Sequence, residues 1–201
     1  MNGIIIMINT KTAELLLLGV ALGGIAFLAD QEYNSSAPTK SGEIKVEPIK
    51  VEPMPMTPEQ KRWLCALDQD CVTIAEATYF EARGESIEGK RGVGLVIMNR
   101  VEANHFPDTV TDVVYAQRRG ICQFEYVCLF GKKKRKEMIA KNPESWGNSL
   151  AVAYDVVSGK VADFTQGADH YFNPKKVKRT PLFAKVYEHV ASIGGHEFYR
   201  R

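Results

Sequence analysis

Two glutamates in the segment YFEARGE, residues 79–85, are the first candidates for chemistry in the sequence. Glu81 and Glu85 lie four residues apart, close to Gly84, a residue type that is common where helices end. A carboxyl group at a helix C-terminus meets the negative end of the helix dipole, and apolar neighbours also disfavour its charged form. Both effects raise a pKa, so Glu81 has the features of a general acid that donates a proton near neutral pH.

A plainer interpretation of the same residues competes with this one. Arg83 would lower the pKa of Glu81, and Glu85 would simply pair with Arg83 or Lys90. Because charged helix ends are common, these residues alone favour a solvated helix terminus without a catalytic role.

The elements that must position Glu81 are predicted to be mostly helical. Thr57 followed by Pro-Glu-Gln is typical of a helix start, and residues 59–68 predict a short helix. Apolar residues at three- and four-residue steps predict a second helix from Val72 to the glycine of YFEARGE.

The rest of the folded part continues this pattern. Helices are predicted at 88–103, 109–117, 144–158 and 181–191, and loops or short strands at 118–131 and 160–180. Glycines 92 and 94 would let the helix at 88–103 pack closely. The fold class is therefore mainly α, of an α+β kind, with an irregular half that forms a cleft.

Three segments are predicted along the chain. Residues 1–30 contain a long apolar run and predict a signal peptide or membrane anchor, although a buried soluble helix would have the same pattern. Residues 31–58 repeat IKVEP and predict a flexible Pro/Lys/Glu linker. Residues 59–201 form the folded domain.

A family resemblance rests on six ordered motifs. YFEARGE is followed by EGKRGVGLVIMNRV, FPDTV, CQF, GADHYFNP and IGGHEFY. Their order and spacing resemble those of the cell wall hydrolase family, which includes the spore cortex-lytic enzymes of the SleB and CwlJ type. The resemblance covers about residues 72–200, and six motifs in order are far more specific than one.

The resemblance implies a lysozyme-like or lytic-transglycosylase-like fold that cleaves the glycan strands of peptidoglycan. It maps the catalytic acid to Glu81. A lytic transglycosylase needs one carboxyl group, because the 6-hydroxyl of the muramic acid closes onto C1 and gives an anhydro product. Glu85 is a candidate for a second catalytic carboxylate. If Glu85 or another acid lies across the cleft, water is the nucleophile and the enzyme is a muramidase. Neither route needs a metal or organic cofactor.

The other motifs supply candidates for supporting or substrate-binding roles. Gln123 and Phe124 would line a sugar groove through an amide hydrogen bond and ring stacking, respectively. His170, Tyr171 and Asn173 would bind N-acetyl groups or steady the acid. The alternatives are core packing for the two aromatic residues, and hydrogen bonds that shape a loop for the histidine and asparagine.

The four cysteines fall into two local pairs. Export into an oxidising compartment favours disulfides, and we expect Cys65 with Cys71 and Cys122 with Cys128. An offset of six residues requires an intervening turn in each pair. A zinc site is the competing interpretation, but the spacings do not match those of common zinc ligands.

The charge pattern bears on partners. The formal net charge is +2, too small for a dedicated nucleic-acid binder. GKKKRKE, residues 131–137, predicts a solvated loop that would attract the carboxylates of peptide stems and other anionic wall polymers. We expect an exported monomer in the periplasm or cell envelope, which is held at the inner membrane by its N-terminus and does not bind nucleic acid.

Two other classes of function remain open from the sequence. One is a non-catalytic peptidoglycan-binding module of an envelope or phage assembly, and the other is a zinc amidase that cuts the stem peptide. An intact EARGE disfavours the binding module, because a binding groove does not require a poised acid. A phage lysis enzyme and a cellular wall-remodelling enzyme fit the sequence equally well.

Overall fold

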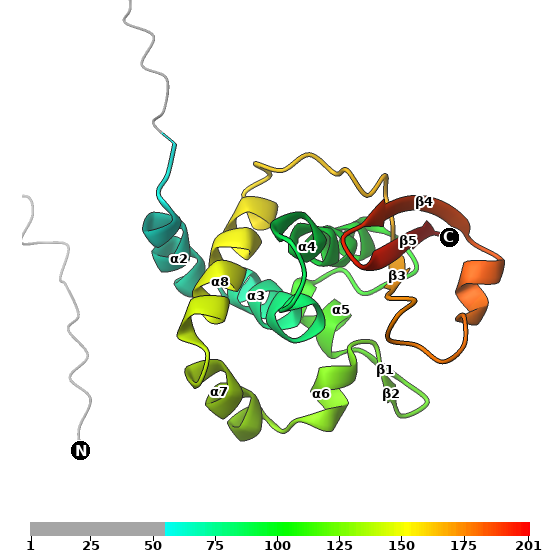
Figure 1. Cartoon of the computed structure of the whole chain (residues 1–201), viewed down its shortest axis with the longest axis horizontal. Helices are drawn as coiled ribbons and strands as arrows, with labels where there is room; N and C mark the ends of the chain where they lie inside the picture. The colour runs from blue at the N-terminus through cyan, green and yellow to red at the C-terminus, as the bar shows by residue number, and fades with distance from the viewer. Residues whose placement is uncertain (1–54) are drawn as a thin grey trace, which may run out of the picture. The chain divides into compact units, whose positions relative to one another are not determined.

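A computed structural model describes residues 55–201 of the chain. The predicted apolar segment 1–30 and nearly all of the predicted linker 31–58 lie outside these residues. The described part is mainly helical, with two small sheets (Figure 1). Within residues 55–201, no helix has the length and apolar character needed to cross a membrane.

Four helices form the centre of the domain. They are α2 (Pro58–Ala66), α3 (Gln69–Ala82), α4 (Ile87–Glu102) and α8 (Pro143–Val157). Helix α3 is buried along most of its length and packs against both α4 and α8 (Figure 1). A Cβ atom at Gly94 would lie 3.2 Å from Val156 and 3.3 Å from Ile74, so this glycine lets α4 approach its two neighbours.

Side-chain caps begin helices α2 and α3. Thr57 accepts a hydrogen bond from the Gln60 amide and forms a capping box at the start of α2. Asp68 accepts from the Cys71 amide at the start of α3. The predicted helix start at Thr57 is thereby confirmed.

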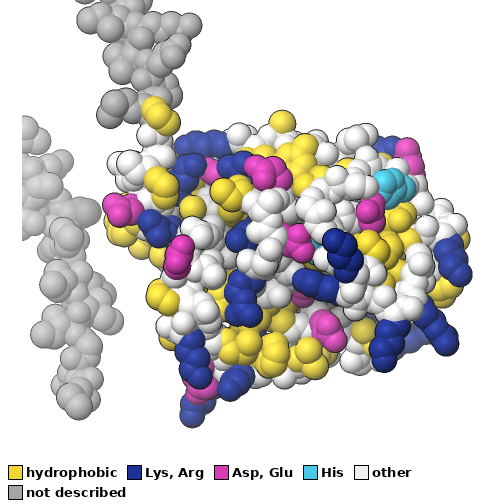
Figure 2. Space-filling model, viewed as in Figure 1, with side chains coloured by type: hydrophobic (Ala, Val, Ile, Leu, Met, Phe, Trp, Pro, Cys, Tyr) yellow, Lys and Arg dark blue, Asp and Glu magenta, His cyan; other side chains and the backbone are white. Residues whose placement is uncertain are grey.

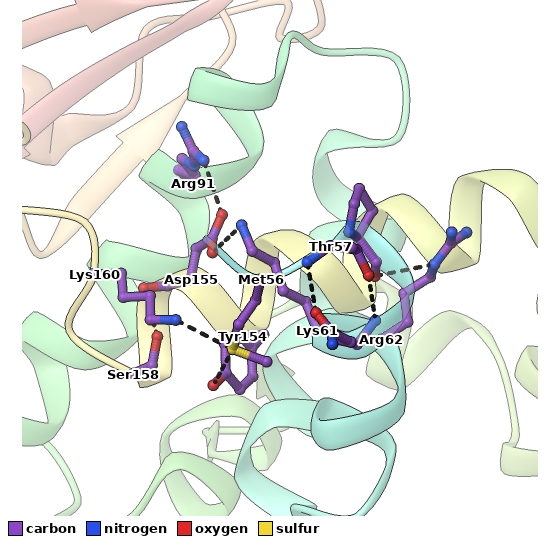
Figure 3. A network of polar contacts seen from close by, with 11 residues as sticks. Met56, Thr57, Lys61, Arg62, Arg91, Tyr154, Asp155, Ser158 and Lys160 are labelled. Carbon is purple, nitrogen blue, oxygen red and sulfur yellow. Dashed lines mark hydrogen bonds and ion pairs between the residues drawn. The ribbon is translucent and has the colours of Figure 1, made fainter. Parts of the chain in front are cut away.

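An ion-pair network joins α2 to α4 and α8 (Figure 3). Asp155 on α8 accepts from Lys61 on α2 at 2.8 Å and from Arg91 on α4 at 2.9 Å. Met56, just ahead of α2, lies with its sulfur 3.2 Å from the Tyr154 hydroxyl. The start of the folded domain is therefore held by α8 as well as by its own helix cap.

Shorter elements lie between α4 and α8, and one more lies between two strands of the C-terminal sheet. They are α5 (Val110–Tyr115), β1 (Gln117–Arg118), β2 (Ile121–Cys122), α6 (Glu125–Leu129), α7 (Lys132–Ala140) and the 3₁₀ turn η1 (Leu182–Lys185).

An antiparallel sheet of three strands closes the domain at its C-terminus. Its order is β3 (His170–Phe172), β5 (His196–Arg200), β4 (Glu188–Ile193) (Figure 1). Gly194 has a φ of +61°, as the tight turn between β4 and β5 requires. Phe198 of β5 packs on α4, where a Cβ atom at Gly92 would approach its ring to 2.6 Å. The sheet is thus seated directly on α4.

Three predicted elements were wrong. The segment 118–131, expected to form loops or short strands, also contains helix α6. The helix expected at 181–191 is only the turn η1 followed by strand β4, because pairing with β5 governs residues 188–193. The basic segment 131–137 is not a loop but lies almost entirely in helix α7. Its Arg135 turns inward, pairs with Glu76 at 2.8 Å and donates to the Phe130 carbonyl at 2.7 Å. Such a tertiary contact leaves no periodic signal in the sequence.

Candidate active site

Glu81 lies in the last turn of helix α3, one residue before the helix ends at Ala82. The preceding Tyr79 is fully buried and donates a hydrogen bond to the Met138 carbonyl, which anchors this end of the helix. Arg83 turns toward Tyr79, with its guanidinium 5.3 Å from the ring centre, and does not pair with Glu81. The cation that the sequence suggested as a neighbour of Glu81 is therefore engaged elsewhere.

The Glu81 side chain faces a cavity of about 440 Å³. Segments far apart in the chain line it, namely the end of α3, the last turn of α4, the segment from β2 through α6, β3 with the loop that follows, and the start of β5. Its polar lining comprises Glu81, Arg100, Gln123, Glu125, Tyr126, Tyr171, Asn173, Lys176 and His196. Its apolar lining comprises Phe80, Cys122, Phe124, Leu129, Phe130, Phe172 and Val177. A partly apolar cavity with a few convergent polar groups is typical of a ligand site.

Burial and nearby charge raise the pKa of Glu81 to about 7. Removal from water is the largest cause, and the negative charge of Glu125 adds to it. The positive charges of Lys176 and Arg100 act in the opposite direction, as does the Tyr171 hydroxyl. Glu81 can therefore hold a proton near neutral pH and still be stabilised after it gives that proton away.

Arg100 and Tyr171 form the wall behind Glu81. The Arg100 Nε donates to the Asp169 carbonyl at 2.7 Å, and its guanidinium lies over the rings of Phe106 and Phe124. Burial and the charge of Glu81 raise the pKa of Tyr171 well above its ordinary value, so its hydroxyl stays protonated and can donate to the carboxylate. Both groups favour the ionised form of the acid.

Glu85 is held away from this chemistry. It accepts a hydrogen bond from the Gly195 amide at 2.8 Å and another from Asn173 Nδ2 at 3.2 Å. It pairs with neither Arg83 nor Lys90, and it does not line the cavity. Glu85 therefore joins the start of α4 to the β4–β5 turn and to the end of β3.

Asn173 lies at the cavity but uses its side chain within the fold. Besides donating to Glu85, its Oδ1 accepts from the Lys175 amide at 3.0 Å. These bonds match the loop-shaping role that the sequence left open for this residue.

His170 does not reach the cavity, which corrects the role expected for it. Side chains alternate along a strand, so Tyr171 faces Glu81 while His170 points to the other side of β3. Its Nδ1 lies 2.7 Å from Asp169 Oδ1, and its ring packs against Phe183 and Tyr187.

The CQF motif contributes one exposed and one buried residue. Gln123 is exposed at the cavity and is free to meet a ligand. Phe124 is only 2% exposed and packs beneath Arg100 and beside Tyr126, so its ring builds the wall and is not open for stacking on a sugar.

The structure contains both expected disulfides. Cys65 is bonded to Cys71 where α2 meets α3, and Cys122 is bonded to Cys128 between β2 and α6. The second disulfide spans the cavity wall that carries Gln123 and Glu125. All four cysteines are used in these bonds. No cluster of His, Cys, Asp or Glu suited to a metal ion occurs within residues 55–201.

Sequence reasoning missed several residues of the cavity, above all Glu125, Lys176 and His196. Glu125 follows CQF directly, so an acid beside a recognised motif was the available signal. His196 is 3% exposed, burial lowers its pKa, and its Nδ1 has no hydrogen-bond partner among the described residues. Lys176 gave no periodic or motif signal of its own.

Comparison with known proteins gives a consistent set of relatives. The family model described as Cell Wall Hydrolase matches residues 84–199, which begin just after Glu81. A spore cortex-lytic enzyme from Oceanobacillus iheyensis is 47% identical over 133 residues, which are 64% of this chain and 41% of the relative. Another from Halalkalibacterium halodurans is 29% identical over 131 residues, which are 65% of this chain and 34% of the relative. This chain therefore spans between about a third and two fifths of the length of these relatives.

One solved structure among the similar ones is the catalytic domain of the germination-specific lytic transglycosylase SleB from Bacillus anthracis. It is 28% identical, and the alignment covers 66% of this chain and 96% of that domain with a TM-score of 0.49.

Proposed function

The chain belongs to the Cell Wall Hydrolase family, and we propose that it cleaves the glycan strands of peptidoglycan with Glu81 as its general acid. The observation that carries this proposal is the Glu81 carboxyl group, which faces a cavity and has its pKa raised to about 7. The names of the relatives, spore cortex-lytic enzymes, support the same substrate class. We include in the proposal a lysozyme-like fold, in which a buried helix presents the acid at its end.

The reaction we assign is that of a lytic transglycosylase acting between N-acetylmuramic acid and N-acetylglucosamine. Glu81 donates its proton to the glycosidic oxygen while the bond from that oxygen to C1 breaks, and the leaving sugar departs with a hydroxyl group. The 6-hydroxyl oxygen of the muramic acid then bonds to C1. Glu81, now a carboxylate, accepts the proton of that hydroxyl. The acid is regenerated, and no water is consumed.

The charges around Glu81 suit both halves of this cycle. Burial and Glu125 keep the proton on Glu81 before cleavage. Arg100 and Lys176 stabilise the carboxylate that forms afterwards, so the group is neither permanently protonated nor permanently ionised near neutral pH.

Product analysis tests this reaction. We expect the full-length protein, incubated with purified peptidoglycan, to release anhydro-muramyl products that mass spectrometry identifies. Reducing-end muramic acid would instead show hydrolysis. Binding without release would favour a wall-binding module, and freed peptides with intact glycan, lost on adding a chelator, would favour a zinc amidase.

A muramidase is the second candidate, because the structure offers a second carboxylate. Glu125, the first residue of α6, is exposed at the same cavity, and its charge acts on Glu81. Two carboxyl groups that flank a glycosidic bond are the usual requirement for hydrolysis by water. Glu85 is unsuited to that place because its oxygens are bonded to Gly195 and Asn173.

The variant Glu125→Gln separates the two reactions through its pH profile. Glu81 must be protonated to act, so activity should fall as the pH rises through about 7. Removing the negative charge of Glu125 lowers the pKa of Glu81, and the alkaline limb of kcat/KM should move to lower pH while most activity remains. The variant should lower the pKa of Glu81 by less than the full amount by which that pKa is raised, because burial is the larger cause of the raised pKa.

Glu102→Gln serves as the matched control, since Glu102 is exposed and does not line the cavity. Its profile should overlay that of the unmodified protein. Loss of activity by about 100-fold or more at every pH in Glu125→Gln would instead identify Glu125 as the second carboxylate of a muramidase.

This function requires export. We assign residues 1–30 to a signal peptide or inner-membrane anchor, residues 31–58 to a tether, and residues 59–201 to the catalytic domain of a monomeric envelope protein. The apolar run and the IKVEP repeat support these assignments.

A further inference from the structure

The loop after strand β3 brings a run of basic side chains to the cavity. Residues 174–180 read PKKVKRT, and Lys175, Lys176, Lys178 and Arg179 are all exposed. Lys176 and its neighbour Val177 line the cavity that contains Glu81. Lys176 therefore lies at the candidate active site, and the other three cations lie within three residues of it along the chain.

Hydrogen bonds hold the beginning of this loop in place. Asn173 accepts from the Lys175 amide through its side chain and from the Lys176 amide through its backbone carbonyl, each at 3.0 Å. The same side chain donates to Glu85 at the start of α4. The basic run is thus anchored to the domain at the end that meets the cavity.

The charges of the loop are not neutralised within the fold. None of its four cations forms an ion pair with another of residues 55–201. By contrast, Lys61 and Arg91 share the carboxylate of Asp155. Cations that lack counter-charges beside a binding cavity favour an anionic group on the ligand.

The loop differs from other basic segments of the surface in its position at the cavity and not in its charge. Lys and Arg side chains occur at several places on the face shown in Figure 2. Helix α7 exposes Lys132, Lys133 and Lys136, a charge similar to that of the loop, but no residue of α7 lines the cavity. A strand seated at Glu81 would therefore meet Lys176 of the loop directly, whereas α7 begins two residues beyond the lining residue Phe130.

We propose that Lys175, Lys178 and Arg179 bind the carboxylates of the peptide stems carried by the glycan strand, so that strands with charged stems are the preferred substrate. This inference rests on the proposed function. Stem peptides branch from the muramic acid beside the bond to be cleaved, and each carries more than one carboxylate. A cationic loop at the cavity mouth lies where such stems would leave the active site.

The test compares two substrates that differ only in stem charge. Soluble peptide-bearing strands are used directly, or after their carboxylates are converted to amides with a carbodiimide and ammonia. We expect the full-length protein to have a higher kcat/KM for the charged strands, by about three- to ten-fold at low salt, and a smaller preference at high salt. The triple variant Lys175→Gln/Lys178→Gln/Arg179→Gln should bring the ratio of the two kcat/KM values close to one.

The variant Lys132→Gln/Lys133→Gln/Lys136→Gln removes the same charge from α7 and should keep the ratio. An unchanged ratio in the loop variant, or an equal loss of preference in both variants, would overturn the proposal. Cleavage of the amidated strands, compared between the unmodified protein and Glu81→Gln, reports the proposed glycan cleavage separately. Failure of the stem preference can therefore be distinguished from failure of the function itself.

Discussion

Replacing Glu81 with glutamine is expected to lower the rate of glycan cleavage by about 10²–10⁴-fold, the usual contribution of a general acid or base. Glutamine has nearly the same shape but cannot donate a proton to the glycosidic oxygen or accept one from the attacking hydroxyl. The measurement is muropeptide release from purified peptidoglycan, followed by mass spectrometry. Binding to peptidoglycan should be largely retained, because the cavity keeps its lining.

The control for this variant is Glu102→Gln, which makes the same chemical change at an exposed residue outside the cavity. Both variants should have melting temperatures close to that of the unmodified protein. If Glu81→Gln released products at more than a tenth of the normal rate, Glu81 would not be the catalytic acid.

The second large effect is expected at Glu85, and it should be an effect on stability. Glu85→Ala removes the acceptor for the Gly195 amide and for Asn173 Nδ2. Hydrogen bonds to charged groups contribute about 1.5–3 kcal/mol each, so the free energy of unfolding should fall by about 3 kcal/mol. For a domain of this size the melting temperature should fall by about 6–12 °C, as measured by circular dichroism.

Comparison with Glu85→Gln separates a structural from a catalytic role. The glutamine oxygen can still accept from the Gly195 amide, so this variant should be more stable than Glu85→Ala and should keep at least about a tenth of the cleavage rate. A catalytic carboxylate would behave differently, since both variants would be equally inactive. A stable Glu85→Gln protein without activity would contradict the structural role.

The sequence predicted the central helices well because their signals are local. Helices α3 and α4 carry apolar residues at helical spacing, and the structure places them close to the predicted ranges. The two disulfides were also predictable, since each closes within a short segment. By contrast, β4 is held by its pairing with β5, and the contact between Arg135 of α7 and Glu76 of α3 joins segments far apart in the sequence.

The candidate site was predictable only in part, for a similar reason. Glu81 stood out through its motif, but the cavity around it is assembled from segments that a linear sequence does not place together. His170 and Tyr171 are neighbours in one motif, yet the alternation of the strand sends only Tyr171 to the acid. Glu125 was missed because it begins a five-residue helix in a segment predicted as loop or strand.

The disulfide between Cys122 and Cys128 has a consequence for when the site is complete. It joins β2 to α6, so one wall of the cavity is cross-linked only after oxidation. In the export route proposed above, newly made chains would carry these residues as thiols in the reducing cytosol, and the cross-link would form in an oxidising compartment. Under the export proposed above, completion of the cavity would be tied to crossing the membrane and would be delayed until the protein meets its proposed substrate.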